Sequence, residues 1–240
     1  MNIVQIFTVA LVFSANISPV FSVTSRTPAQ SLMSLKDAKK QFAKSPEQLK
    51  NIKNTIQAYY EAQKPNQESV YEKEVRTICQ TALEKHFKTH KVTAKSAIVF
   101  DIDETVLSDY QLFKQKNFEW TTDDYCDFRL KKACTPILPT RDFFLELKKL
   151  RYKIIFLTSR RDTHLQATQE NLAAYGYTYD ELFLLPTELL EQHVSHAAWK
   201  LQIRQELSKK YDIVGSISDS LSDFEGGYCG VMVKLPNYLY

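Results

Sequence analysis

An apolar segment that ends on two carboxylates is the feature that most constrains this chain. Residues 97–100 are four consecutive apolar residues, and their β-branching predicts a buried parallel strand. Asp101 and Asp103 follow directly, with a single residue between them. Ligands of open α/β sheets bind beyond the carboxyl ends of the strands, so we expect both carboxylates in a crevice and not in the core.

Two carboxylates so close together need a cation. Mg²⁺ is held by a few carboxylate and carbonyl oxygens plus water, and it also binds phosphate oxygens. One carboxylate would then attack phosphorus while the other donates and later removes a proton. A calcium loop shares the first spacings, but Val106 stands at its glycine position and Leu112 at its glutamate position. A pair of acids that caps the next helix remains the other alternative.

Composition limits the class of protein. With 240 residues, 44% of them hydrophobic and 25% charged, the chain can bury a large core and suits one α/β domain with embellishments. The net charge of +3 is small and the basic residues are scattered, which predicts no nucleic-acid polymer as partner. A small phosphate-bearing molecule is compatible with this balance, and so is a homo-oligomer.

The first residues predict export. Residues 3–13 form an apolar run that is short for a membrane span but suits a signal peptide. We expect residues 1–22 to be removed ahead of Val23, which would place a chain without stable membrane insertion in the periplasm or outside the cell. Ala15 offers a competing cut. No Lys or Arg precedes Arg26, so retention as an anchor and a buried first helix stay open.

The cysteines predict disulfides if the chain is exported, because the outer compartments are oxidising. We expect the pairs Cys126 with Cys134 and Cys79 with Cys229, and buried free thiols are the alternative. No Cys-x-x-Cys pair occurs, which argues against a zinc site.

Three regions follow from the apolar patterning. Residues 23–95 predict an N-terminal helical region that packs on the core, with helices divided at Pro46 and Pro65. Residues 96–240 predict the core, interrupted at about 109–139 by an insert that would cap the pocket mouth. The aromatic residues of this insert either clamp a ring of the substrate or form the insert's own small core.

Further strands are predicted at 152–157, 182–185, 212–215 and 230–235, and they alternate with helices. This alternation predicts a right-handed, doubly wound parallel sheet. Because the carboxyl ends of parallel strands share one edge, polar residues beyond the later strands are expected near the first pair of acids. They are Thr158, Ser159, Arg160, Lys200, Asp219 and Asp223.

Each of these residues has an ordinary alternative. Thr158 and the following N–H groups would form a phosphate cradle at a helix N-terminus, but Thr-Ser before a helix is also a common N-cap. Arg160 offers a bidentate grip on phosphate or sugar. Lys200 is either a surface lysine or the cation that offsets the carboxylates. Asp219 and Asp223 would supply the remaining metal ligands.

The strand ends thus supply, in chain order, Asp-x-Asp, Thr, Lys and Asp-x-x-x-Asp. This order resembles the haloacid dehalogenase (HAD) superfamily of phosphatases. The chain is similar to the secreted acid phosphatases of subfamily IIIB in four features. They are the Asp-Ile-Asp-Glu-Thr motif of residues 101–105, the N-terminal helices, the short insert and the Thr-Ser-Arg second motif. That subfamily includes bacterial class B and C acid phosphatases and plant vegetative storage proteins. The resemblance covers about residues 49–240 and implies an HAD-type, Rossmann-like sheet with a small cap insert.

The resemblance also implies residue roles. Asp101 would attack phosphorus to give an aspartyl-phosphate, and Asp103 would protonate the leaving alkoxide and then activate water. Thr158 and Lys200 would hold the phosphoryl oxygens.

Mg²⁺ would be bound by Asp101, the backbone carbonyl of Asp103 and Asp219. Asp223 would support this set or serve as an alternate ligand, because Ser-Ile-Ser-Asp stands where relatives often have Gly-Asp.

The resemblance, together with the predicted signal peptide, therefore implies a secreted, Mg²⁺-dependent acid phosphatase that hydrolyses small phosphomonoesters such as nucleoside monophosphates or aryl phosphates. Two other functions remain open. One is a storage or binding protein that kept the fold without turnover, and the other is a phosphotransferase.

Overall fold

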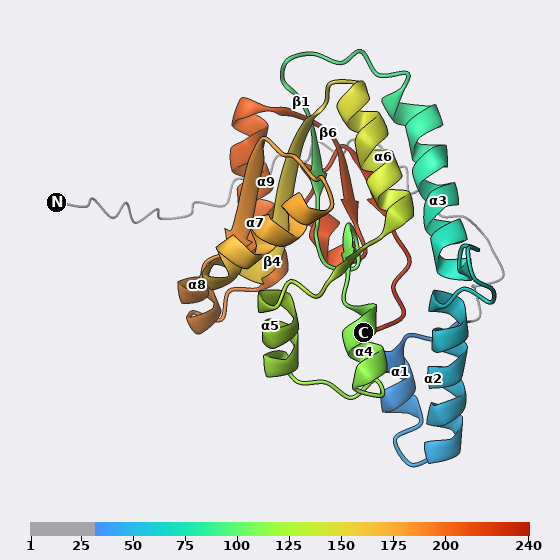
Figure 1. Cartoon of the computed structure of the whole chain (residues 1–240). Coiled ribbons are helices and arrows are strands. Elements are labelled where there is room, and N and C mark those ends of the chain that lie inside the picture. Colours follow the sequence, from blue (N-terminus) through green and yellow to red (C-terminus); the bar gives the residue numbers. More distant parts are fainter. Residues whose placement is uncertain (1–31) are drawn as a thin grey trace.

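The computed structural model describes residues 32–240, so the predicted signal segment, residues 1–22, lies outside the described residues. Five parallel strands form one sheet in the order β5-β4-β1-β6-β7, with helices on both faces (Figure 1). The predicted doubly wound α/β fold is confirmed. The strands are β1 (Ser96–Phe100), β4 (Lys153–Arg161), β5 (Glu181–Leu185), β6 (Asp212–Ser218) and β7 (Val231–Lys234).

The strand β1 lies at the centre of the sheet and is buried along its whole length. Its last residue, Phe100, is level with Phe156 of β4 and with Ile217 of β6. The strands β1 and β6 therefore end within one residue of each other at this edge, whereas β4 runs past it to Arg161. This register brings the segments that follow Phe100, Phe156 and Ile217 to one place.

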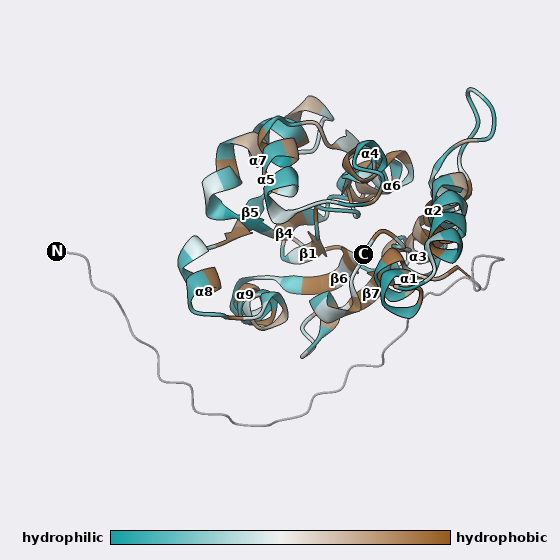
Figure 2. Ribbon diagram, turned by 90° about the horizontal axis from the view of Figure 1, so that it is seen from below, coloured by the Kyte–Doolittle hydropathy of each residue, from teal (hydrophilic) through white to brown (hydrophobic). Residues whose placement is uncertain are grey.

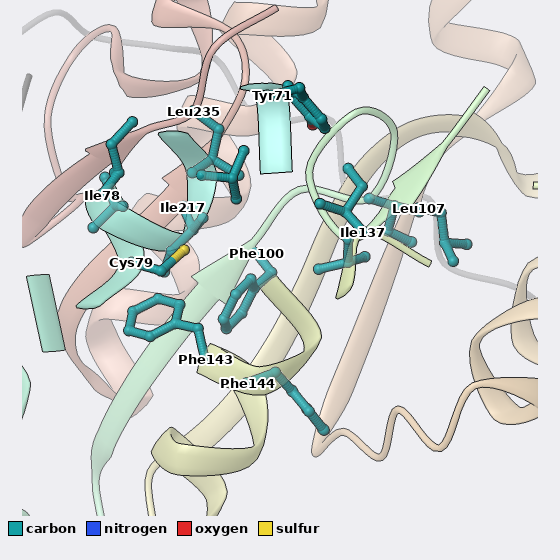
Figure 3. Close-up of a cluster of buried hydrophobic side chains, with 14 of the residues drawn as sticks. Tyr71, Ile78, Cys79, Phe100, Leu107, Ile137, Phe143, Phe144, Ile217 and Leu235 are labelled. Atoms are coloured by element: carbon teal, nitrogen blue, oxygen red, sulfur yellow. The ribbon is translucent and has the colours of Figure 1, made fainter. Parts of the chain in front are cut away.

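Two apolar layers cover the sheet, because successive side chains of β1 point to opposite faces. Ile98 and Phe100 join the larger layer, which packs under α3, α6 and α7, and Figure 3 shows part of it. Ala97 and Val99 join the smaller layer, which packs under α8 and α9. The helices are α3 (Val70–Ala82), α6 (Leu138–Lys149), α7 (Leu165–Ala174), α8 (Thr187–Glu191) and α9 (His196–Lys210).

The apolar and polar residues are distributed accordingly. In Figure 2 the hydrophobic colour is concentrated on the strands in the middle, and the outer helices show mostly hydrophilic colour. Within residues 32–240, the helices are all too short or too polar to traverse a lipid bilayer.

The predicted N-terminal helices are α1 (Leu35–Gln41), α2 (Pro46–Tyr60) and α3, which continues as a π-helix over Leu83–Phe87. A capping box formed by Ser69 and Glu72 starts α3, since each side chain satisfies a backbone N–H group of the other residue. The helix α3 packs against α6, and the hydroxyl of Tyr152 donates to the carbonyl of Phe87 at 2.9 Å. The division of the chain into three regions stays a prediction.

The insert after β1 is tied at its base by a two-stranded antiparallel ladder. Leu107–Ser108 (β2) pairs with Thr135–Pro136 (β3), and the short helices α4 (Tyr110–Gln115) and α5 (Thr122–Leu130) lie between them. The rings of Phe113, Trp120 and Tyr125 meet edge to face, with centroids 4.5–6.0 Å apart. These three rings form a small core of the insert itself, which was the second of the two alternatives for its aromatic residues.

The two predicted disulfides are not formed, and all four cysteines are free thiols. Cys79 lies on the buried face of α3 among apolar side chains, whereas the thiol of Cys229 donates to the carbonyl of Gly227 at 3.1 Å. The thiol of Cys134 donates to Asp109 at 3.0 Å, and Cys126 is half-buried on α5. The alternative of free thiols therefore holds. Each buried cysteine contacts a different group and none contacts another cysteine in a disulfide.

Candidate active site

The turn after β1 presents both acids of the first motif on one side. The carbonyl of the buried Ile102 accepts three N–H groups of the following residues, which closes a tight turn. Glu104 has φ +52°, a left-handed conformation that tightens the turn further. Asp101 and Asp103 are each only 9% exposed, so their charges must be balanced within the protein.

Lys200 balances Asp101. It lies one turn into α9, whose N-terminus is capped by the side chain of Ser195. Its Nζ donates to Asp101 Oδ1 at 2.6 Å and to Asp223 Oδ2 at 2.5 Å. Burial acts to lower the pKa of Lys200, but the two carboxylates outweigh it and the pKa is raised. Lys200 is therefore a buried cation and not a surface lysine, and it bridges two separate strand ends.

The pKa of Asp101 is raised despite its contact with Lys200. Burial raises its pKa well above the ordinary value, Lys200 opposes this rise, and the nearby acids Asp223 and Asp219 add to it. Three carboxylates, those of Asp101, Asp223 and Asp219, therefore lie near Lys200 in this part of the site.

Asp103 is held by guanidinium groups. Arg160, fully buried on β4, donates to Asp103 from Nε at 2.9 Å and from Nη2 at 2.7 Å. Arg129 of the insert lies 3.4 Å from the same carboxylate. Burial alone would raise the pKa of Asp103, but Arg129 and Arg160 outweigh it and hold the pKa below its ordinary value. Arg160 thus binds an acid of the site, and its predicted grip on phosphate or sugar stays a prediction.

Thr158 is fully buried, and its hydroxyl accepts the N–H of Arg160 at 3.2 Å. The predicted helix N-terminus at Thr158 is wrong. Pairing with β5 carries β4 on to Arg161, and only a 3-10 turn, Asp162–His164, precedes α7. Neither the predicted N-cap nor the predicted helix-terminal cradle is present. Ser159 is half-buried on the alternate side of the strand.

Asp219 follows β6 and reaches the turn after β1. Its N–H donates to the hydroxyl of Thr105 at 3.0 Å. Its Oδ2 accepts the amide of Asn237 at 2.6 Å and the hydroxyl of Tyr240 at 2.8 Å. Burial raises the pKa of Asp219, and the hydrogen bonds from Asn237 and Tyr240 oppose the rise.

Asp223 lies in the 3-10 helix Leu221–Phe224 and accepts the hydroxyl of Ser218 at 2.6 Å in addition to Lys200. A small cavity opens beside it, between the ends of β1 and β6 and the helix α9. Asp101, Lys200 and Asp223 line this cavity, but Asp103, Thr158 and Asp219 do not. The structure thus brings Asp101, Lys200 and Asp223 into direct contact and places the other predicted residues around that contact.

The donors fit a hard divalent cation. No group of three His, Cys, Asp or Glu side chains within residues 32–240 is arranged to hold an ion alone. A Mg²⁺ ion takes only one or two carboxylates together with carbonyl groups and water, so it needs no such cluster. Asp101 and Asp219 provide two buried carboxylates at neighbouring strand ends, which are hard oxygen donors of the kind that Mg²⁺ takes.

Several residues of the site were not predicted from the sequence. Arg129 also binds Asp109 at 2.6 Å and lies over the ring of Tyr125 at 4.5 Å. Glu104, fully buried, accepts the N–H of Asp109 at 2.5 Å, and burial raises its pKa well above the ordinary value. The sequence signal that could have indicated Arg129 is an arginine within a helix of the insert. No sequence pattern indicates Asn237 or Tyr240.

Comparison with known proteins gives a consistent picture. A family model described as HAD superfamily, subfamily IIIB (acid phosphatase), matches residues 23–240. The stem 28 kDa glycoprotein of Glycine max is 34% identical over 156 residues, which cover 62% of this chain and 61% of that protein. Vegetative storage protein 2 of Arabidopsis thaliana is 29% identical over 180 residues, which cover 71% of this chain and 66% of that protein.

Acid phosphatase 1 of Solanum lycopersicum is 27% identical over 148 residues, which cover 59% of this chain and 57% of that protein. Among solved structures, the class C acid phosphatase of Bacillus anthracis matches with a TM-score of 0.61 and 21% identity. The match covers 80% of this chain and 86% of that one. At this identity the likeness concerns the fold. The matched part of this chain spans about three-fifths of the stem glycoprotein.

Proposed function

The chain belongs to the HAD superfamily, subfamily IIIB, the acid phosphatase family, and on this basis we propose that it hydrolyses small phosphomonoesters. One observation supports the proposal above the others. Lys200 bridges Asp101 and Asp223, so that residues from three distant segments meet at one strand edge. The proposed substrates are nucleoside monophosphates or aryl phosphates, whose phosphate group would bind at this edge.

In the first step, Asp101 attacks phosphorus, and the bond from phosphorus to the ester oxygen breaks. Oδ1 of Asp101 accepts the hydrogen bond from Lys200, which leaves Oδ2 to act as the nucleophile. Asp103 gives its proton to the departing oxygen. In the second step, Asp103 takes a proton from water as that water attacks phosphorus, and the bond between Asp101 and phosphorus breaks to release phosphate.

The protonation of Asp103 needs a physical explanation, because Arg129 and Arg160 hold its pKa low before substrate arrives. A phosphate ester brings negative charge into the site, and nearby negative charge raises the pKa of a carboxyl group. Acid pH acts in the same direction. Substrate binding therefore prepares Asp103 as a proton donor, while the two arginines stabilise the carboxylate that remains after transfer.

A divalent cation is part of the proposal, since members of the HAD superfamily typically use one, and we assign Mg²⁺ to it. Asp101, the backbone carbonyl of Asp103 and Asp219 would hold it, with Asp223 in support. When bound, such an ion neutralises charge that develops on the phosphoryl oxygens. Thr158 and Lys200 would contact the same oxygens, which gives the site the positioning that phosphoryl transfer needs.

Export is proposed from the sequence. The apolar run of residues 3–13 is typical of a signal peptide, and the family match begins at residue 23, directly after the proposed cut. The mature chain would then work in the periplasm or outside the cell.

A second candidate is a storage protein without turnover. Its support is the names of the relatives, which include vegetative storage proteins and stem glycoproteins. The preformed contacts of Lys200 with Asp101 and of Arg160 with Asp103 favour the enzyme, because storage alone needs neither buried ion pair.

The deciding assay is phosphate release from p-nitrophenyl phosphate and adenosine monophosphate between pH 4 and 7, with Mg²⁺ or with a chelator. We expect turnover that the chelator abolishes. Asp101→Asn should lose measurable activity and keep its circular dichroism spectrum, whereas Ser159→Ala should keep most of its activity because Ser159 is half-buried on β4 while its neighbours Thr158 and Arg160 are fully buried. A folded wild type that is inactive on every ester would favour the storage protein. Equal rates for wild type and Asp101→Asn would refute the assigned nucleophile.

A further inference from the structure

The last residues of the described chain form part of the site. After β7 the chain runs as a strap, defined here as residues 235–240, between the sheet and the N-terminal helices (Figures 1 and 2). The strap is fixed on both sides. The N–H of Leu35 donates to the carbonyl of Tyr238 at 2.9 Å, and the N–H of Tyr238 donates to the hydroxyl of Tyr60 at 3.1 Å. Leu235 and Leu239 are fully buried.

Two polar groups of the anchored strap donate hydrogen bonds to the same atom, Oδ2 of Asp219. The amide of Asn237 donates to Asp219 Oδ2 at 2.6 Å, and the hydroxyl of Tyr240 donates to the same oxygen at 2.8 Å. The amide oxygen of Asn237 also accepts the N–H of Leu239 at 2.8 Å, which fixes the orientation of the amide. Although Tyr240 is 41% exposed as a residue, its hydroxyl reaches a carboxylate that is only 5% exposed.

The other carboxylate oxygen of Asp219, Oδ1, accepts fewer and weaker hydrogen bonds than Oδ2. Within the described chain, the hydrogen-bond contact of Oδ1 is a weak one from the hydroxyl of Thr105 at 3.5 Å, on the turn that carries Asp101 and Asp103. Two strong donors therefore occupy Oδ2 while Oδ1 faces that turn with most of its accepting capacity free. A carboxylate that is held in this way is oriented as a one-oxygen ligand.

We propose that Asn237 and Tyr240 are positioning residues that fix Asp219 for a divalent cation, with Oδ2 taken by the strap and Oδ1 left for the ion. This inference rests on the proposed function for the presence of the cation. It adds that the N-terminal helices and the insert contribute to the site through the strap, since Tyr60 holds Tyr238, and the ring of Phe113 lies 6.2 Å from that of Tyr240.

The test is the dissociation constant of Mg²⁺, measured by isothermal titration calorimetry on the full chain without substrate. Tyr240→Phe removes one hydroxyl and keeps the ring, and Asn237→Leu removes the second donor at similar volume. Because loss of an outer partner of a metal ligand weakens binding about 10–100-fold, we expect each variant to raise the dissociation constant about tenfold or more. Tyr228→Phe is the control, since Tyr228 is 51% exposed and outside the strap, and it should bind as wild type does.

A second readout separates positioning from general stability. Activity of Tyr240→Phe should return toward the wild-type rate when Mg²⁺ is raised in proportion to the weakened affinity. Thermal unfolding without Mg²⁺ shows whether the fold is kept. If both variants bind Mg²⁺ as tightly as an active wild type, the inference is overturned and the proposed function stands. If both variants lose affinity while wild type releases no phosphate, the inference holds and the proposed function fails. A wild type that binds no Mg²⁺ overturns the inference.

Discussion

Replacement of Arg160 by methionine tests the electrostatic account of the site most directly. Arg160 has no exposed side-chain surface, and it makes three hydrogen bonds of 2.7–3.2 Å to Asp103. Methionine fills a similar volume but leaves Arg129, at 3.4 Å, as the remaining ion-pair partner of Asp103 within residues 32–240. Removing one partner of a buried ion pair costs about 3–5 kcal/mol, so we expect the free energy of unfolding of Arg160→Met to fall by about that amount at pH 7.

Urea denaturation at constant temperature measures this change, with the midpoint and slope compared between proteins. The neighbouring Arg161 is exposed on the same strand, so Arg161→Met is a matched control that should change the free energy of unfolding by less than about 0.5 kcal/mol. Arg160→Lys should recover part of the loss, because an ammonium keeps the charge without the bidentate geometry.

The pH dependence supplies a second criterion. Since the pKa of Asp103 is lowered in the folded protein, its contribution to stability is present above the ordinary aspartate pKa and is lost as pH falls through the folded value. The deficit of Arg160→Met should therefore be largest near neutral pH and shrink as the pH falls below about 4. A deficit under about 1 kcal/mol at pH 7, or one equal to that of Arg161→Met, would refute the reasoning.

Two further predictions concern other parts of the fold. A Cβ on Gly215 of β6 would lie 2.6 Å from the buried ring of Phe87, so Gly215→Ala should lower the free energy of unfolding by about 1–3 kcal/mol, and Phe87→Leu in the same chain should restore part of it. Burial and the nearby Arg129 lower the pKa of His164, so its protonation is disfavoured in the fold and stability should decrease as pH falls below about 6.5. His164→Gln should reduce the slope of unfolding free energy against pH between 5 and 7, and an unchanged slope would contradict this.

The sheet could be predicted from the sequence because apolar runs bounded by polar residues determine buried parallel strands. The approach of Asp219 to the turn after β1 followed from the same rule, since β1 and β6 end at one edge, whereas Lys200 reaches Asp101 from the helix α9. The side-chain partner of each residue could not be predicted in this way. Arg160 turned toward Asp103 because the strand continues to Arg161, and that continuation depends on pairing with β5.

Other parts of the site depend on tertiary contacts that leave no local pattern. Asn237 and Tyr240 reach Asp219 only because Leu35 and Tyr60 hold the strap, and no spacing in the sequence reports such a contact. The predicted disulfides were wrong. An even number of cysteines in an exported chain suggests that disulfides can form, but it does not show which cysteines lie close together.

The central position of β1 has a consequence for how the molecule assembles. The contacts of the β1 turn join residues far apart in the sequence. The separation is 57 residues for Asp103 with Arg160, 99 for Asp101 with Lys200, and 114 for Thr105 with Asp219. Contacts of such long sequence separation make folding slow, because the loops must close before the contacts form. Until those segments arrive, the middle strand has two open hydrogen-bonding edges, and partly folded chains would be most prone to associate with one another at that stage.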